Sequence, residues 1–344
     1  MNTTTSLSPQ VESIINHCIN SFAWQPDADL LSHLRRALRS KLEGIAPEQI
    51  QNTYLKTFDI PQIILFDILA NRFPLVLEAQ QLINKCILEV ALNQEQICII
   101  DLGIGRSVQM LRILQSLDEC KSLKTVTVIG VEIQQDSLAF STSLLNEKKN
   151  SFHYDLVFHP INAAIETIDI EHFAALIPPK CRLIANASLA LHHVQSKAAR
   201  SNIFKQLSTL QLDLFTLIEP NVDCFTDNFE ARLLNAYEHF GALYSYINTL
   251  DLSAEEKSGL KQFFSNELFD AIAIPNEYRF EKYDLSNNWC AIGKASGFSS
   301  YPIGQLAEGL KIPGINISQN EMGYVNFAFG QTDILGVIIL KDTR

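Results

Sequence analysis

An acid and two glycines follow a short apolar run in the segment ICIIDLGIGRS, residues 97–107. The apolar run predicts a buried strand, which places Asp101, Gly103 and Gly105 at its carboxyl end. In an open parallel sheet, ligands bind beyond the carboxyl ends of the strands, and glycine there lets the backbone approach a ligand closely. Asp101 could accept a hydrogen bond from the amides of the turn or from a ligand ammonium group. The alternative is a tight structural turn without a ligand.

The residue types of this turn distinguish between two classes of nucleotide ligand. A dinucleotide-binding motif has a third glycine, and its backbone faces a pyrophosphate. Here Ser107 occupies the third place, and an acid precedes the glycines. This pattern favours a cationic ligand with an amino acid tail, such as S-adenosylmethionine, over a nicotinamide dinucleotide.

A second acid, Glu132, ends the next apolar run in VIGVEI. An acid at that strand end can accept hydrogen bonds from both ribose hydroxyls of a nucleoside. A solvated strand end is the alternative. Together with the glycine turn, Glu132 predicts a nucleoside pocket that also includes Ile133. Asn162, which follows the third strand, would then face the adenine edge.

Two adjacent histidines, His192 and His193, follow the fourth predicted strand in LIANASLALHHV, and Asn186 ends that strand. Methyl transfer to a hydroxyl oxygen needs positioning and a base with a pKa near neutrality, and histidine meets the second need. Neighbouring residues on a helix point about 100° apart, so at most one of the two would face the site. A structural role for each histidine is the alternative.

Another acid, Glu219, ends the fifth predicted strand in LFTLIEPNVDCF. It could orient a methyl acceptor or cap a helix of the segment that follows. His153 and His159 flank the third strand without partners at metal-ligand spacing, and the cysteines form no CxxC pair. The sequence therefore predicts no metal site.

The pattern of elements predicts an α/β fold. Apolar strand-like runs alternate with helical patterns, which is typical of a parallel sheet covered on both faces. The strands are expected at 97–101, 126–132, 154–159, 181–186 and 213–219, and the helices near 107–117, 135–149, 162–176 and 194–209. Two further apolar runs, YVNFAFG and ILGVIIL, predict an antiparallel hairpin at the end of the chain. This arrangement matches the S-adenosylmethionine methyltransferase fold, a relative of the Rossmann fold.

Helical patterns also frame this core. Before it, they cover roughly 10–22, 28–42 and 47–56 and a helix that begins at Pro74; after the fifth strand, a long helical stretch covers 226–272. We therefore divide the chain into a helical region, 1–92, that contributes to a cap, and a methyltransferase-like core, 93–344, with a helical cap insertion at about 222–275.

Composition limits the classes of partner. The net charge of −11 and the pI near 5.2 argue against direct binding of nucleic acid. The start of the chain lacks the pattern of a signal peptide, and no apolar run reaches the roughly 20 residues of a membrane span. The seven scattered cysteines are expected to be buried, reduced thiols. We expect a cytoplasmic protein without a membrane partner, while export by a route without a signal peptide stays open.

Five segments, in order, resemble motifs of the GRAS family, whose plant members include the DELLA, SCARECROW and SHORT-ROOT regulators. They are FPLVLEAQQLINKCILEV (first leucine-rich region), IIDLGIGRSVQMLRILQSL (VHIID), LIANASLALHHV (second leucine-rich region), LIEPNVDCFTDNFEARLLNAYEHFGALYSYI (PFYRE) and RFEKYDLSNNWCAIGKASGF (start of SAW). The residues at matching places are Asp101, Gln109, Phe229, Tyr237, Leu243, Arg279, Glu281, Trp289, Gly297 and Phe298. The resemblance runs from about residue 60 to the end of the chain.

The resemblance implies a Rossmann-type methyltransferase core with a helical cap, and three departures qualify it. His193 stands where the family usually has arginine, and the final Ser-Ala-Trp is absent. Gly103 and Gly105 are retained where plant members commonly have a bulkier, acid-rich turn. A working cofactor pocket would require these glycines, so the chain looks like a bacterial member close to the enzyme ancestor. By the same analogy, bacterial members modify small molecules.

Three functions follow as hypotheses. The first is an S-adenosylmethionine-dependent methyltransferase that acts on a small hydrophobic or aromatic molecule. The second is a non-catalytic regulator of GRAS type that binds a small molecule, a protein or a second copy of the chain through the helical cap. The third, a nucleotide-dependent oxidoreductase, is disfavoured by the missing third glycine.

Overall fold

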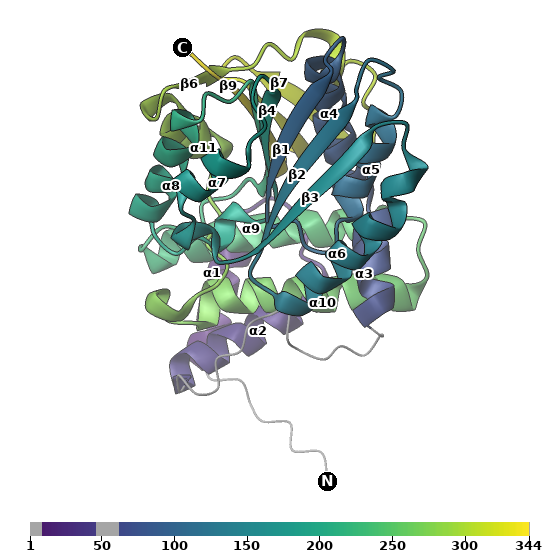
Figure 1. Cartoon of the computed structure of the whole chain (residues 1–344). Helices are drawn as coiled ribbons and strands as arrows, with labels where there is room; N and C mark the ends of the chain where they lie inside the picture. The colour runs from purple at the N-terminus through teal and green to yellow at the C-terminus, as the bar shows by residue number, and fades with distance from the viewer. Residues whose placement is uncertain (1–8, 46–61, 344) are drawn as a thin grey trace.

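A mixed sheet organises the chain in the computed structural model, which describes residues 9–45 and 62–343 (Figure 1). Five of its strands are parallel: β1 (Gln96–Leu102), β2 (Thr125–Glu132), β3 (Asp155–Asn162), β4 (Arg182–Ser188) and β5 (Leu214–Pro220). The sheet order is β3-β2-β1-β4-β5-β9-β8-β7. The strand order therefore reverses between β1 and β4, which is where open α/β sheets bind ligands.

The C-terminal strands run antiparallel to their neighbours. They are β6 (Phe298–Ser300), β7 (Ile315–Asn320), β8 (Tyr324–Phe329) and β9 (Thr332–Asp342), with β9 paired to both β5 and β8. The predicted fold class, a Rossmann-like core with a C-terminal antiparallel hairpin, is confirmed. The prediction of only two terminal strands was wrong, because β6 and β7 also join this part of the sheet.

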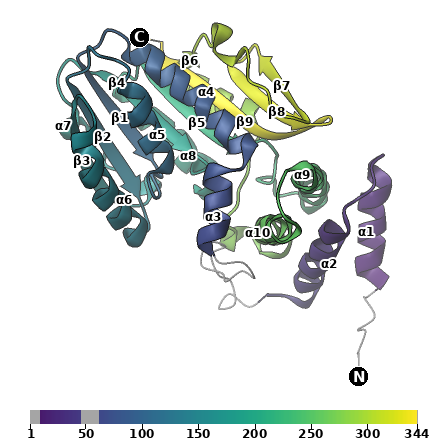
Figure 2. The same ribbon diagram turned by 90° about the vertical axis from the view of Figure 1, so that its right-hand side faces the viewer.

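Helices cover both faces of the sheet (Figures 1 and 2). On β1, Ile97 and Ile99 belong to the apolar cluster that includes α4, α5 and α6, whereas Cys98 and Ile100 belong to the cluster of α7, α8 and α11. These helices are α4 (Pro74–Ala91), α5 (Val108–Leu117), α6 (Gln135–Lys148), α7 (Ile170–Leu176), α8 (Lys197–Thr209) and α11 (Ser286–Ala295). Because successive strand residues face opposite sides, a solid apolar strand serves both clusters.

A second group of helices packs together, and one of its members also contacts strands β8 and β9 of the sheet. It consists of α1 (Pro9–Ser21), α2 (Ala28–Glu43), α9 (Phe229–Thr249) and α10 (Ala254–Ala273), and α3 (Gln62–Asn71) lies between it and the sheet (Figure 2). We call these four helices the helical layer. Trp24, which follows α1, stacks on Tyr237 of α9 with 5.0 Å between ring centroids. The layer thus joins the start of the chain to the segment that follows β5.

Several predicted boundaries differ from the structure. The helix expected over 162–176 is shorter, because β3 continues to Asn162 and α7 begins only at Ile170. The stretch 226–272 consists of two helices, since a capping box between Ser253 and Glu256 starts α10. The helix α11 was not predicted, and the helix expected at 47–56 lies outside the described residues.

Two further features bear on the sequence predictions. Six of the seven cysteines are buried, Cys181 is half-buried, and all are free thiols. Among the described residues, no helix combines the length and the apolar character needed to cross a bilayer.

The contact between Trp24 and α9 provides a test of the helical layer. A Cβ added to Gly241 would lie 2.0 Å from the Trp24 ring, so Gly241→Ala should overpack this contact. We expect the free energy of unfolding to fall by about 1–3 kcal/mol, although alanine is the better helix former. Urea denaturation measures the change.

A double variant that carries Gly241→Ala together with Trp24→Leu controls for other effects, because the smaller side chain leaves room for the methyl group. The two changes should then destabilise by less than the sum of their separate effects. A Gly241→Ala protein as stable as the original chain would contradict the packing described.

Candidate functional site

The glycine turn after β1 is bonded to the end of β2. The amides of Gly103 and Ile104 donate to the carbonyl of Val131 at 2.9 and 3.0 Å. Gly103 has a φ of +82°, and a Cβ there would lie 2.6 Å from the Cβ of Ala190, in the loop after β4. Glycine is therefore required both by the backbone conformation and by the closeness of that loop.

Glu132 is directed at the same turn. One carboxylate oxygen, Oε2, accepts a hydrogen bond from the amide of Gly105 at 3.0 Å, and Oε1 accepts from the amide of Gln134 at 2.8 Å. The hydroxyl of Ser141 donates to the carbonyl of Gly105 at 2.6 Å. The half-buried carboxylate is thus held in one orientation beside the glycine turn, and each oxygen keeps a second acceptor position.

Asp101 lies in the sheet beneath the turn. It is 4% exposed, and its Oδ1 accepts from the side-chain amide of Asn186 at 2.8 Å, while Asn186 Oδ1 accepts from the Thr216 hydroxyl at 2.9 Å. We expected Asp101 to accept from the amides of the turn or from a ligand. The amides of Gly103 and Ile104 instead donate to the carbonyl of Val131.

The charge state of Asp101 reflects this burial. Burial raises the pKa of Asp101 to about 7; the hydrogen bond from Asn186 opposes the rise, and the negative charge of Glu132 adds to it. The acids end neighbouring strands, because Asp101 pairs with Gly130, two residues before Glu132.

The remaining residues predicted to bind the cofactor lie around this turn. Ser107 is buried with a φ of +60°, and its hydroxyl has no hydrogen-bond partner among the described residues. Ile133 is 66% exposed. The side-chain amide of Asn162 donates to the carbonyls of Glu132 and Ile133 at 2.8 and 3.0 Å, which fixes the end of β2.

Glu219, at the end of β5, holds the loop that follows β4. Its Oε1 accepts hydrogen bonds from the amides of Ala190 and Leu191 at 3.2 and 2.7 Å, and its Oε2 lies 2.6 Å from Nδ1 of His192. Glu219 therefore caps the short 3₁₀ turn Leu191–His193, not a helix of the segment after β5.

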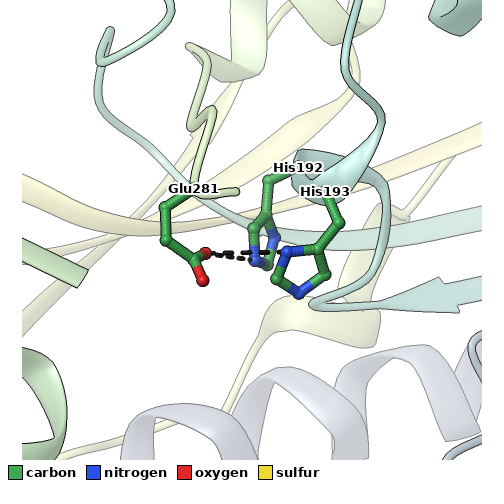
Figure 3. Close-up of side chains that lie close together, drawn as sticks. All are labelled: His192, His193 and Glu281. Carbon is green, nitrogen blue, oxygen red and sulfur yellow. Dashed lines mark ion pairs between the residues drawn. The ribbon is translucent and has the colours of Figure 1, made fainter. Parts of the chain in front are cut away.

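The two histidines of that turn converge on one acid, Glu281 (Figure 3). Oε2 of Glu281 lies 3.2 Å from Nε2 of His192 and 3.7 Å from Nδ1 of His193, and the two imidazole centroids are 4.0 Å apart. We expected at most one of the two histidines to face the site, on the assumption of a helix. In the structure the residues form a short 3₁₀ turn, and both side chains approach Glu281.

The carboxylates set the protonation of the two imidazoles. Burial disfavours the charged form of His192, but Glu219 and Glu281 more than offset it and raise the pKa of His192 to about 10. For His193, burial and the neighbouring His192 charge lower the pKa, although Glu281 acts in the opposite direction. The pair therefore combines a charged imidazole with a neutral one near pH 7.

Further acids behind Glu281 were missed from the sequence. Asp270 of α10 accepts hydrogen bonds from the amides of Phe280 and Glu281 at 2.9 and 3.0 Å, and the Tyr283 hydroxyl donates to Glu267. Burial, with the charge of Glu281, raises the pKa of Glu267 to about 8 and that of Asp270 to about 7. The segment RFEKYD contributed to the family resemblance. Nothing in its sequence indicated that the side chain of Glu281 would lie beside the two histidines.

Comparison with known proteins identifies the family. A model described as the GRAS domain family matches residues 5–310. The chain belongs to the GRAS family. This confirms the resemblance read from the five motifs, whereas the bacterial origin stays a prediction.

Individual relatives are distant. The chain is 22% identical to Scarecrow-like protein 1 of Arabidopsis thaliana and 24% identical to chitin-inducible gibberellin-responsive protein 2 of rice (Oryza sativa subsp. japonica), over 64% and 65% of its length. It spans 39% and 43% of the length of these two GRAS relatives. The crystal structure of SCL7 from Oryza sativa superimposes with a TM-score of 0.78 at 18% identity, over 97% of this chain and 100% of that one, which shows the shared fold.

The burial of Asp101 predicts a pH dependence of stability. A raised pKa in the folded state means that stability is lost as pH rises from the ordinary value of 3.8 towards about 7. Asp101→Asn removes this loss and keeps an oxygen for the bond from Asn186. The difference in free energy of unfolding between the variant and the original chain should therefore shift in favour of the variant by about 1–3 kcal/mol from pH 5 to pH 8. Denaturant unfolding at each pH measures it.

Asp155→Asn is the matched control, because Asp155 is exposed at the start of β3. It should show a much smaller difference between the two pH values. If Asp101→Asn and Asp155→Asn behaved alike, the assigned environment of Asp101 would be wrong.

Proposed function

We propose that this GRAS protein binds S-adenosylmethionine and transfers its methyl group to a small hydrophobic or aromatic molecule. One observation carries the proposal: Asp101 and Glu132 end neighbouring parallel strands on either side of a turn that contains Gly103 and Gly105. This is the edge of the sheet, beside the reversal of strand order, at which open α/β folds bind nucleosides.

Each residue of the turn would contact a different part of the cofactor. Glu132 would accept the ribose hydroxyls on the oxygen positions that the amides of Gly105 and Gln134 leave available. Asp101 would ionise beside the ammonium group of the ligand, since an opposite charge favours the carboxylate. The glycines would let the ligand approach the backbone, and Asn186 would orient Asp101 from below.

The methyl acceptor would lie towards the loop after β4. Ala190 of this loop lies against Gly103, and the two histidines follow after Leu191. Glu219 and Glu281 flank the imidazole of His192, so His193, whose side chain is 34% exposed, is the better placed base. The helical layer would close over the acceptor and exclude water.

A second candidate is a non-catalytic regulator of the same fold. It is favoured by two observations: both oxygens of Glu132 already hold backbone amides, and Asp101 is nearly inaccessible. Under this proposal the helical layer would bind a protein partner or a second copy of the chain. A relative named Scarecrow-like transcription factor PAT1 is 19% identical over 65% of this chain.

Calorimetry with S-adenosylhomocysteine, the demethylated product, separates the two candidates. The proposal predicts saturable binding that Glu132→Ala weakens by about 100-fold, since each hydrogen bond to a charged group contributes about 1.5–3 kcal/mol. Glu132→Gln, which keeps one acceptor oxygen for the turn, should weaken binding by a smaller factor.

Glu166→Ala is the control, because Glu166 is exposed in the short turn after β3 and should leave the affinity unchanged. Absence of heat with folded protein, for both the cofactor and its product, would rule out the methyltransferase and leave the regulator.

A further inference from the structure

Three side chains outside the nucleoside half of the site form a compact donor set. His192, His193 and Glu281 each offer one ligand atom, and these atoms lie within 4.8 Å of one another (Figure 3). Two are nitrogens of adjacent residues after β4, and the third is a carboxylate oxygen from the segment after α10. Glu281 is far from the two histidines in the sequence. The spacing of possible ligands along the chain therefore did not indicate this set.

The orientation of His192 is that of a metal ligand. Its Nδ1 lies 2.6 Å from Oε2 of Glu219, which leaves Nε2 directed at Glu281. Metal-binding histidines almost always donate their second ring N–H to a carboxylate or carbonyl, because this fixes the tautomer and the orientation of the ring. Glu219 would serve as that outer carboxylate.

Glu281 is buried without the hydrogen bonds that a carboxylate requires. Its side chain is 1% exposed, and neither oxygen has a hydrogen bond of good geometry among the described residues, although Oε2 lies 3.2 Å from Nε2 of His192. A buried carboxylate in this position calls for a cation that faces it directly.

A proton on His192 supplies only part of that compensation. It would bond one nitrogen to Glu281, whereas two nitrogens converge on the same oxygen. A metal ion would displace the Nε2 proton of His192 into solvent and coordinate all three atoms. The separations of 3.2 and 3.7 Å are each within about 0.1 Å of the range, about 3.3–3.6 Å, of tetrahedron edges that bonds of zinc length give.

We propose that His192, His193 and Glu281 bind one divalent transition-metal ion of the zinc class. Two imidazoles and a carboxylate are the donor set of catalytic zinc sites, which keep a fourth position for water or substrate. His193 is 34% exposed in its side chain and would line the route of entry. The site is independent of the cofactor, because it requires no contact with Asp101, Gly103 or Glu132.

The donor set is held in place by backbone contacts. Asp270 accepts from the amide of Glu281, and the amide of Lys282 donates to the carbonyl of His192 at 3.2 Å. These bonds join the segment after α10 to the loop after β4. In the methyltransferase proposed above, an ion here would bind an acceptor hydroxyl and favour its deprotonation, and His193 would then be a ligand instead of a base.

The test is titration of chelator-treated, full-length protein with Zn²⁺ and with Co²⁺. We expect one equivalent of Zn²⁺ to bind and to raise the melting temperature, and Co²⁺ to give the visible spectrum of a tetrahedral site. His193→Asn and Glu281→Gln should each lower the affinity at least 10-fold. His193 is part-exposed, so its variant tests the site even if the buried Glu281 variant does not fold.

His172→Asn is the matched control, since His172 is exposed on α7 and its loss should change nothing. Failure of the original chain to bind either ion would overturn the proposal. The proposal would also be overturned if His193→Asn left metal binding intact. The same holds if His172→Asn weakened binding as much as His193→Asn. Because calorimetry with S-adenosylhomocysteine is read separately, loss of one proposal does not decide the other.

Discussion

The carboxylate of Glu219 is the contact on which the arrangement of the site depends. It is 1% exposed, and it bonds two amides of the loop after β4 with one oxygen and His192 with the other. Because Glu219 ends the adjacent strand β5, the pairing of β4 with β5 fixes the position of this loop. The same loop presents Ala190 to Gly103, so one acid aligns the glycine turn with the histidines.

Burial of so many charged groups is costly unless each has a partner, and the structure pairs most of them. Arg200 lies 3.3 Å from Asp284 and also donates to the carbonyls of His192 and Lys282. These bonds tie the segment after α10 to the end of the sheet. Loss of one partner would leave a buried charge unpaired, which typically costs about 3–5 kcal/mol. Such a network stabilises one arrangement of the loops against others.

Much of the fold could be predicted from the sequence, because interior parallel strands are continuously apolar. The predicted runs at 97–101 and 126–132 differ from the observed strands β1 and β2 by no more than one residue at either end. The strand β7 was missed because its sequence, INISQN, has only two apolar residues, ends in three consecutive polar residues and follows proline and glycine. The short helix α7 was overestimated, since apolar spacing alone does not show where β3 ends.

The site divides in the same way. The placement of Asp101, the glycines and Glu132 follows from the strand ends, which local patterns mark. The meeting of His192, His193 and Glu281 depends on a tertiary contact across 89 positions of the sequence, from 192 to 281. It also depends on the side-chain orientations of two adjacent residues in a short 3₁₀ turn, which the sequence pattern does not specify.

A crystal structure of the protein with S-adenosylhomocysteine tests the central claim, that the ends of β1, β2 and β4 form one site. The account predicts the ribose hydroxyls on the carboxylate of Glu132, the adenosine over the turn of Gly103 and Gly105, and the sulfur directed towards His193. A ligand bound elsewhere, with Glu132 facing only the amides of Gly105 and Gln134, would contradict it.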